Sequence, residues 1–353
     1  MKQFIGCDSH ARYSVFVSID EQGRVGPAVR VEHGSRELRD YLATLAAGTP
    51  VAVEASGGWY WFFDELEAAG MDARLVNPLE AKRRMGGKNK TDKLDAKGLA
   101  ILLRNGTLPE VWVPPEGLRD LRGLMRARLS LRSQTTVLKN RMHAAIRRYG
   151  TLRGEPRSDL FTAKSWPKLA LAMGRLPDET RAATWHECEL LREMERHLGE
   201  MEIRIGARIG SIGWVRLLKS LPGVGEILGA TIYLEIGDVR RFPTAEHLAS
   251  YAGLVPTVHA SGGKSHHGPT SKQANHYLRW AFVEAAACIV SHKQQRQGQH
   301  VVELYERLKK QKGHGKAAVA VARHLAEASW WMLSKKEAYR APQRQAMSSS
   351  KNG

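Results

Sequence analysis

Cysteine is scarce in this sequence, which contains only Cys7, Cys188 and Cys288 among its 353 residues. Their spacing matches no zinc motif and no disulfide framework, so a reduced, packed thiol is expected at each position. Long apolar runs are also missing, which argues against a helix that crosses a bilayer. The N-terminal segment lacks the basic region, apolar core and small-residue cleavage site of a signal peptide. We therefore expect a cytoplasmic protein with no membrane partner.

Acidic residues are the second shortage. The chain has 36 Asp and Glu against 54 Lys and Arg, which gives a formal net charge of +18. An excess of this size favours a polyanionic partner, and without a membrane-spanning run nucleic acid is a better candidate than an anionic membrane. Because Arg and Ala are abundant throughout, the clustering of charge is better evidence than its total.

The first 80 residues alternate short strand and helix patterns. We expect strands at residues 4–8, 15–19, 29–31, 50–54 and 73–76. Helices are expected from residue 35 and over residues 59–69, between these strands. Antiparallel strands followed by alternating helices and strands predict an α/β layer.

The middle of the chain, residues 119–201, has a helical pattern with a strongly basic first half. Nine Lys and Arg but only one acid, Asp120, occur between residues 119 and 148. A solvated helix face usually mixes signs, so contact with a phosphate backbone is favoured over a simple exposed face. The predicted contacts are Arg122, Arg126, Arg132, Lys139 and Arg141. Residues 151–180 are expected to be an irregular connector, and residues 184–209 a second helix that pairs with the first as a coiled hairpin.

Four carboxylates are the candidate metal ligands. Asp8 and Glu54 each end a short apolar strand, where side chains of neighbouring strands converge. Asp92 and Asp95 begin a helix, and their i, i+3 spacing places both on one face. Hard, anionic oxygen ligands suit Mg²⁺ or Mn²⁺. Individually, each acid has an ordinary alternative role in a turn, in an ion pair or at a helix start; together, in a basic chain, they indicate phosphoryl transfer.

The C-terminal third contains two glycine-rich motifs. Residues 221–225, Leu-Pro-Gly-Val-Gly, are similar to a helix-hairpin-helix element, in which the amides at Gly223 and Gly225 would approach a DNA phosphate. A tight turn between two packed helices would need glycine as well. Ser261 precedes a second glycine pair and Lys264, and by itself this pattern indicates an ordinary turn.

The order and spacing of these motifs resemble the DEDD insertion-sequence transposases of the "one-ten" and "eleven-eleven" type. The resemblance covers nearly all of residues 1–335. It departs at residues 271–275, Ser-Lys-Gln-Ala-Asn, where many members have Lys-Arg-Gly-Asn or Lys-Arg-Gly-Asp; any role of Gln273 or Ala274 is therefore in doubt. The motifs that carry the resemblance are Cys7-Asp8, the segment 53–57, the segment 90–96, the segment 221–225, and the blocks 251–254, 261–263, 271–272 and 277–279.

The resemblance implies an α/β RuvC-like (RNase H-like) catalytic domain over residues 1–112 and a helical coiled-coil connector over 113–212. It further implies a mainly α-helical transposase domain over 213–340, before a disordered tail at 341–353. Asp8, Glu54, Asp92 and Asp95 would hold Mg²⁺ or Mn²⁺, Ser261 would be the nucleophile, and Lys264 would contact nucleic acid.

The partners implied are DNA, as element ends and target, and a non-coding guide RNA, with the protein acting as a nucleoid-associated homo-oligomer, a dimer or tetramer. Two alternatives stay open: a junction-resolving nuclease without serine chemistry, and a non-catalytic nucleic-acid-binding protein. The four intact carboxylates argue against the second.

Overall fold

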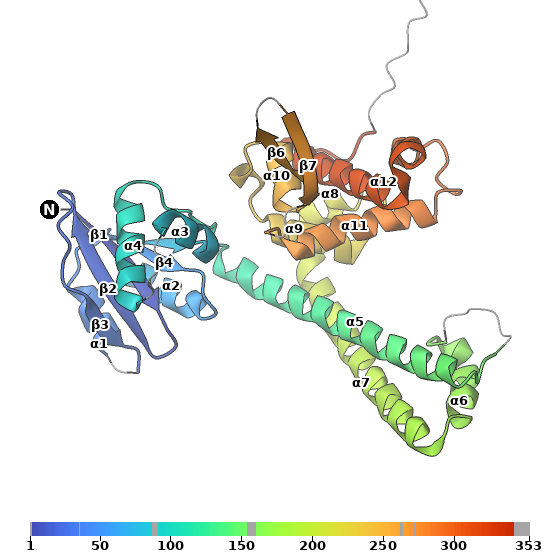
Figure 1. Ribbon diagram of the computed structural model, residues 1–353. Coiled ribbons are helices and arrows are strands. Elements are labelled where there is room, and N and C mark those ends of the chain that lie inside the picture. Colours follow the sequence, from blue (N-terminus) through green and yellow to red (C-terminus); the bar gives the residue numbers. More distant parts are fainter. Residues whose placement is uncertain are drawn as a thin grey trace, which may run out of the picture. The chain divides into compact units, whose positions relative to one another are not determined.

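A computed structural model describes residues 2–34, 36–86, 91–153, 160–261, 264–270 and 273–341 of the chain, with only the backbone for most of 258–270. The chain divides into two compact units, Met1–Val113 and Pro114–Gly353. Figure 1 shows both units coloured along the sequence. None of the described helices is long and apolar enough to cross a membrane.

The first unit is a five-stranded sheet covered by helices on both faces. The strand order is β3-β2-β1-β4-β5, in which β1 to β3 are antiparallel neighbours and β4 and β5 run parallel to β1. The expected strands and α/β layer are therefore present. The strands are β1 (Gln3–Ser9), β2 (Tyr13–Asp20), β3 (Val29–Glu32), β4 (Pro50–Glu54) and β5 (Asp72–Val76). The helices are α1 (Glu37–Ala43), α2 (Trp59–Ala68), α3 (Pro78–Met85) and α4 (Asp92–Arg104).

Alternation along the strands divides the buried side chains of this unit into two layers. On one face, Ile5, Cys7 and Phe16 pack with residues of α1 and α2, such as Phe62. On the other face, residues of β2 and β4 pack against α4. Successive side chains of a strand point to opposite sides, so a run of apolar residues in one strand supplies both layers.

The second unit begins with two long helices that pack along each other. They are α5 (Glu116–Arg148) and α7 (Asp178–Ile209), joined at the far end by η1 (Ala163–Ser165) and α6 (Trp166–Gly174). At this end Met142 of α5, Met173 of α6 and Leu191 of α7 share a small core. The expectation of an irregular connector over residues 151–180 is wrong at α6. Pro167 lies in the first turn of α6, where proline is tolerated. Helix α7 starts six residues before the expected position.

The remaining helices form the largest core of the protein. At the near end of the long pair, Met125 of α5 and Ile205 of α7 pack with Val215 and Leu234. A β-hairpin, which the sequence pattern did not predict, interrupts the helices. The elements are α8 (Gly213–Leu218), α9 (Glu226–Ile236), η2 (Val239–Arg241), α10 (Ala245–Tyr251), β6 (Pro256–Ser261), β7 (Lys264–Thr270), α11 (His276–Ser291) and α12 (His300–Lys335).

Candidate metal centre and nucleic-acid interface

Helix α4 lies directly against strand β1 because β1 has a glycine at the contact. A Cβ atom on Gly6 would come within 1.9 Å of the Ala96 carbonyl oxygen and 2.5 Å of the Ala100 nitrogen. Asp8 lies two residues further along the strand, so its side chain is on the same face as Gly6. Asp92 lies one helical turn before Ala96, at the start of α4. The close packing at Gly6 therefore brings the first turn of α4 to the end of β1.

The register of the parallel strands places Glu54 beside Asp8. Cys7 of β1 pairs with Val53 of β4, and the next residue on each strand is a carboxylate. Neighbouring strands lie about 4.8 Å apart. Asp8 and Glu54 are thus adjacent at the carboxyl ends of two parallel strands.

The start of helix α4 is fixed by a side-chain cap. The hydroxyl of Thr91 accepts a hydrogen bond from the Leu94 amide at 3.3 Å. Asp92 and Asp95 then occupy the first turn, where the helix dipole favours negative charge.

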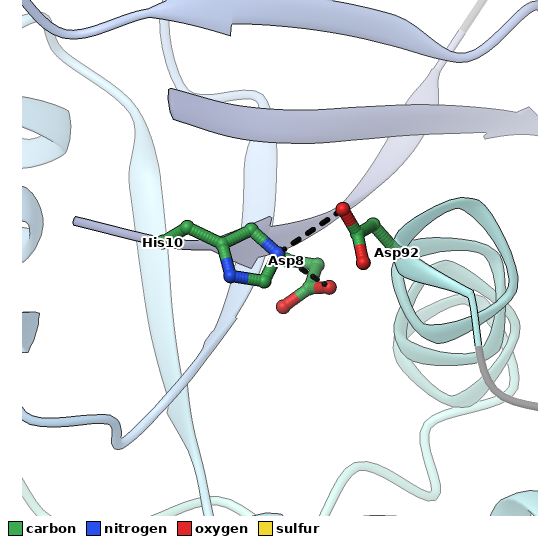
Figure 2. Close-up of side chains that lie close together, drawn as sticks. All are labelled: Asp8, His10 and Asp92. Atoms are coloured by element: carbon green, nitrogen blue, oxygen red, sulfur yellow. Dashed lines mark ion pairs between the residues drawn. The ribbon is translucent and has the colours of Figure 1, made fainter. Parts of the chain in front are cut away.

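Asp8 and Asp92 approach each other around the imidazole of His10. Nε2 of His10 lies 3.3 Å from Oδ2 of Asp8 and 3.2 Å from Oδ2 of Asp92. Figure 2 shows both carboxylates, one from the strand and one from the helix, directed at the same nitrogen of the imidazole. One ligand atom from each of the three residues lies within 4.8 Å of the other two. Glu54 and Asp95 do not belong to this group of three.

The hydroxyl of Tyr13 donates a hydrogen bond to Oδ2 of Asp92 at 3.0 Å. This bond, with a smaller contribution from His10, lowers the pKa of Asp92 and keeps it ionised. The guanidinium of Arg30 lies over the Tyr13 ring, 3.6 Å from its centre. This cation–π contact helps to hold the ring in place.

The geometry of these side chains fits a divalent cation. Two ligands bound to one ion at about 2.0–2.6 Å are separated by no more than roughly 5 Å, and the three ligand atoms meet that limit. His10 and Tyr13 were not among the predicted site residues. The available signal was the Asp-x-His spacing of Asp8 and His10, which two-residue periodicity places on one side of an extended chain.

Comparisons with known proteins identify the family. Residues 5–151 match the DEDD transposase model of the IS110 type, and residues 215–301 match the model described as the transposase IS116/IS110/IS902 family. The chain belongs to the IS110 family of DEDD transposases. The resemblance seen in its sequence motifs is therefore confirmed.

Two relatives match nearly the whole of this transposase, and a third matches a quarter of it. The transposase of insertion sequence element IS1111A from Coxiella burnetii is 25% identical over 96% of this chain and 91% of its own. A protein of insertion element IS116 from Streptomyces clavuligerus is 24% identical over 95% of this chain and 96% of its own. A protein of insertion element IS110 from Streptomyces coelicolor is 40% identical, over 25% of this chain and 22% of its own.

The basic stripe of the transposase on α5 is engaged with carboxylates of its own chain. Arg122 and Arg126 both bind Glu235 of α9, at 2.9 Å and 2.7 Å. Asn275 donates a third hydrogen bond to the same carboxylate at 2.7 Å. Burial alone would raise the pKa of Glu235, but the hydrogen bond from Arg126 and the charge of Arg122 outweigh it and lower the pKa.

Further along α5, the acids of α7 supply the partners. Arg128, which is 7% exposed, binds Glu202 at 2.5 Å. The partners of the other predicted contacts are Glu202 at 3.6 Å for Arg132, Glu195 at 2.7 Å for Lys139 and Glu187 at 2.5 Å for Arg141. Phosphate contact by these residues stays a prediction, and the ion pairs compete with it.

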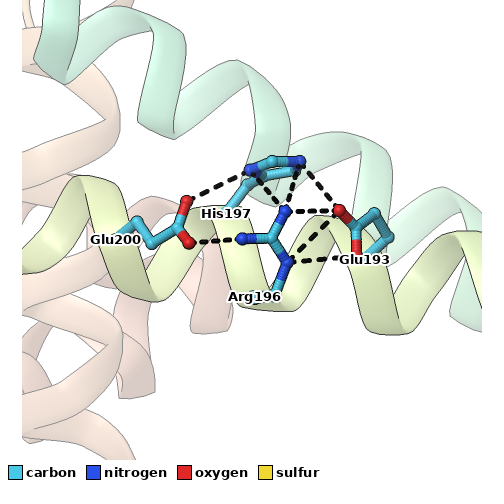
Figure 3. A network of polar contacts seen from close by, with 4 residues as sticks. All are labelled: Glu193, Arg196, His197 and Glu200. Carbon is cyan, nitrogen blue, oxygen red and sulfur yellow. Dashed lines mark hydrogen bonds and ion pairs between the residues drawn. The ribbon is translucent and has the colours of Figure 1, made fainter.

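The exposed charges of α7 also pair within the helix. Arg196 binds Glu193 at 2.5 Å and Glu200, and His197 contacts the same two carboxylates. Figure 3 shows the guanidinium and imidazole groups between the two acids. The hydrogen bond from Arg196 lowers the pKa of Glu193. This face of the hairpin is a network of i, i+3 and i, i+4 pairs, as on many solvated helices.

The glycine-rich motif at residues 221–225 connects α8 and α9, as a helix-hairpin-helix element would. Gly223 has a φ of +77°, and a Cβ there would lie 2.4 Å from the Ala285 carbonyl oxygen of α11. Packing therefore requires this glycine. Gly225 is exposed, with nothing within 4 Å of a Cβ, and precedes α9. Lys219, Ser220, Arg296 and residues 221–225 line a hollow of about 420 Å³.

Ser261 and Lys264 face each other across the hairpin of the C-terminal region. Ser261 is the last residue of β6, and its register partner Lys264 is the first of β7. Their side chains, and residues 262–263 between them, lie outside the described part of the chain, as do Lys88, Lys90 and the predicted tail from residue 342 on.

Proposed function

We propose that this transposase cuts and rejoins DNA by metal-assisted phosphoryl transfer at the Asp8–His10–Asp92 cluster. The observation that carries the proposal is the approach of two carboxylates, from the end of β1 and the start of α4, to within ligand distance of a shared imidazole (Figure 2). Carboxylate oxygens and an imidazole nitrogen at these separations can bind Mg²⁺ or Mn²⁺, and a bound cation would offset the repulsion between the two carboxylates.

The first unit supplies a RuvC-like (RNase H-like) frame for this chemistry. The strand order β3-β2-β1-β4-β5, with an antiparallel start and parallel β4 and β5, supports that assignment. In this frame Glu54 neighbours Asp8, and Asp95 follows Asp92 on the same helix face. We propose that these four carboxylates complete the metal set.

Each side chain has a defined task. A bound divalent cation would polarise the scissile phosphate and stabilise the leaving oxygen. Asp8 and Asp92 would hold it, and Tyr13 would orient Asp92 through its hydrogen bond. A hydrogen-bonded carboxylate keeps its orientation, which is how groups behind the ligands tune a metal site.

Ser261 is the proposed nucleophile. Its hydroxyl oxygen would form a bond to a DNA phosphorus while the phosphorus–oxygen bond to the DNA strand breaks and the released DNA hydroxyl takes up a proton. Attack by a second DNA hydroxyl would reverse these steps and free the serine. The number of phosphoester bonds is conserved, so rejoining needs no external energy source.

The proposed partners are DNA, as element ends and target, and a non-coding guide RNA. A guide RNA would supply sequence recognition by base pairing, leaving the protein to hold phosphates. The active species would be a homo-oligomer, a dimer or tetramer.

Replacing Asp92 by Asn tests the metal centre. Asp92→Asn keeps the side-chain volume but removes the charge, so Mn²⁺ binding by calorimetry and DNA cleavage should each fall at least about 100-fold. Asp120→Asn, an identical change at an exposed acid of α5, should leave both unchanged. Full Mn²⁺ affinity in Asp92→Asn would refute the metal assignment.

Ser261→Ala tests the covalent step. A suicide DNA substrate should trap a protein–DNA adduct that mass spectrometry maps to Ser261, and the alanine variant should form none while still binding nucleic acid. Recombination by Ser261→Ala at the normal rate would eliminate the serine mechanism and favour the junction-resolving nuclease.

A further inference from the structure

Helix α12 carries an exposed basic bend. The helix breaks at Gly313, which has a φ of 77° and a ψ of 170°. No acid occurs between residues 307 and 316. We call this segment the α12 elbow. Its five exposed cations are Arg307, Lys309, Lys310, Lys312 and Lys316.

The cations of the α12 elbow form no ion pair within the described part of the chain. Their weaker contacts are Lys309 with the Tyr305 ring, 5.9 Å from its centre, and Lys309 and Lys310 with the charge of Glu306. Across those residues, no carboxylate lies within ion-pair distance of the five cations. Glu306, the nearest acid in sequence, binds Lys293 at 2.6 Å. Like charges at i, i+3, such as Lys309 and Lys312, disfavour a helix. A bound polyanion would remove this repulsion.

The contrast with α5 points to the elbow as a binding surface. On α5 the predicted phosphate contacts face carboxylates of α7 and α9, as in the 2.7 Å pair of Lys139 and Glu195. A paired cation must give up its partner before it binds a phosphate, whereas an unpaired cation exchanges only small counterions. The chain has a large basic excess, and the elbow concentrates five of its cations in ten residues without acid.

The backbone at the bend is also accessible. A Cβ atom on Gly313 or Gly315 would meet nothing within 4 Å. Both glycines leave the main chain open to close approach by a bulky ligand. The elbow therefore combines concentrated positive charge with an unshielded backbone.

We propose that the α12 elbow binds the phosphodiester backbone of a nucleic acid, as a surface separate from the carboxylate cluster. The proposal rests on the proposed function only in requiring a nucleic-acid partner, and it needs no metal. Duplex DNA and single-stranded RNA present the same phosphodiester chemistry, so the experiment includes both.

The test is a salt titration of nucleic-acid binding by the full chain in EDTA. Fluorescence anisotropy would follow a labelled DNA duplex and, separately, a labelled RNA strand, with Lys310, Lys312 and Lys316 changed together to Gln. The slope of log affinity against log salt should fall by about 0.9 for each lost duplex contact, or about 0.7 for a single strand. The nucleic acid with the larger loss is the one that the elbow holds.

A charge-matched control separates local contact from net charge. Changing Arg181, Arg196 and Arg240 to Gln removes one partly buried and two exposed cations, which pair with Asp178, Glu193 and Asp238. The control should keep the wild-type slope, and an elbow variant with Arg at the three positions should restore it.

Two results would overturn conclusions, and they differ. Equal slopes for wild type, elbow variant and control would eliminate the elbow as a binding surface while leaving the proposed function intact. Failure of the wild-type protein to bind either nucleic acid would contradict the proposed function itself.

Discussion

At the scale of single residues, Gly6 brings helix α4 to the candidate metal centre. The backbone of α4 lies directly against β1 at this residue, and the contact atoms on α4 are main-chain atoms that cannot rotate away. The Asp92 carboxylate depends on this contact because it lies one turn from Ala96 on the same helix. Gly6, which has no side chain, thereby determines the position of the Asp92 carboxylate.

Gly6→Ala should destabilise the first unit and weaken metal binding together. The added methyl group must push α4 away from the sheet, at a cost of about 1–3 kcal/mol or more. Denaturant unfolding and Mn²⁺ calorimetry would measure the two effects. Gly34→Ala is the matched control, because nothing lies within 4 Å of a Cβ there and its φ is ordinary. Unchanged Mn²⁺ affinity in Gly6→Ala would show that the cluster does not need the close contact.

At the scale of elements, Glu235 fastens the long helix α5 to the C-terminal helices. The carboxylate is 2% exposed and receives hydrogen bonds from Arg122, Arg126 and Asn275. Asn275 also caps α11 by accepting from the Leu278 amide at 2.9 Å. One buried acid thus links α5, α9 and α11. Its satisfied partners offset the cost of burying it.

Glu235→Gln should destabilise the second unit by about 3 kcal/mol, because it removes the buried negative charge that Arg122 and Arg126 bind. Glu193→Gln, in the exposed network of Figure 3, should change stability far less because solvent screens that pair.

The stabilising effect of Glu235 should depend on pH. The native pKa of Glu235 is lowered, so its contribution to the free energy of unfolding is present above the ordinary pKa and is lost as pH falls through the native pKa. The stability gap between wild type and Glu235→Gln should therefore close below about pH 4.3. A gap that persists at lower pH would mean that the charge of Glu235 is not the cause.

At the scale of the whole molecule, the candidate reacting groups are divided between two compact units. Asp8 and Asp92 belong to Met1–Val113, and Ser261 belongs to Pro114–Gly353. The basic excess is also uneven, because six cations of α5 pair with acids of their own chain, whereas those of the α12 elbow form no ion pair among the described residues. Chemistry and nucleic-acid binding are therefore expected to respond to different substitutions.

Mixing two inactive variants tests whether the active oligomer combines groups from different chains. Asp8→Asn and Ser261→Ala should each be inactive alone. If one chain supplies the carboxylates and another the serine, mixed oligomers should recover about a quarter to a half of the wild-type DNA-rejoining activity. The recovery is partial because only some pairings of chains contain both intact groups. The measurement uses purified proteins. A mixture as inactive as either variant would show that each chain uses its own pair. The control is the double variant, in which every chain carries both Asp8→Asn and Ser261→Ala, so that no pairing of chains restores an intact pair.

The sequence by itself determined the features that depend on local pattern. Short apolar runs predicted the strands that carry Asp8 and Glu54 at or near their carboxyl ends, since such a run is a property of one segment. The i, i+3 spacing of Asp92 and Asp95 predicted one helix face, and the ordered motifs predicted the family.

Other features were settled only by tertiary structure. Helix α6 was missed because tryptophan and proline suggest a loop until their packing partners are known. The hairpin of β6 and β7 was missed because its glycines and histidines carry little strand signal.

Charge shows the physical difference most clearly. The sequence correctly predicted a basic stripe on the single helix α5. However, the partner of Arg122 is Glu235, which lies 113 residues away in sequence. Ion pairing depends on which elements meet in space, and no local pattern contains that information. His10 is the same case at short range. Its neighbour Asp8 is visible in the sequence, but only the packing of α4 at Gly6 brings Asp92 to the same imidazole nitrogen.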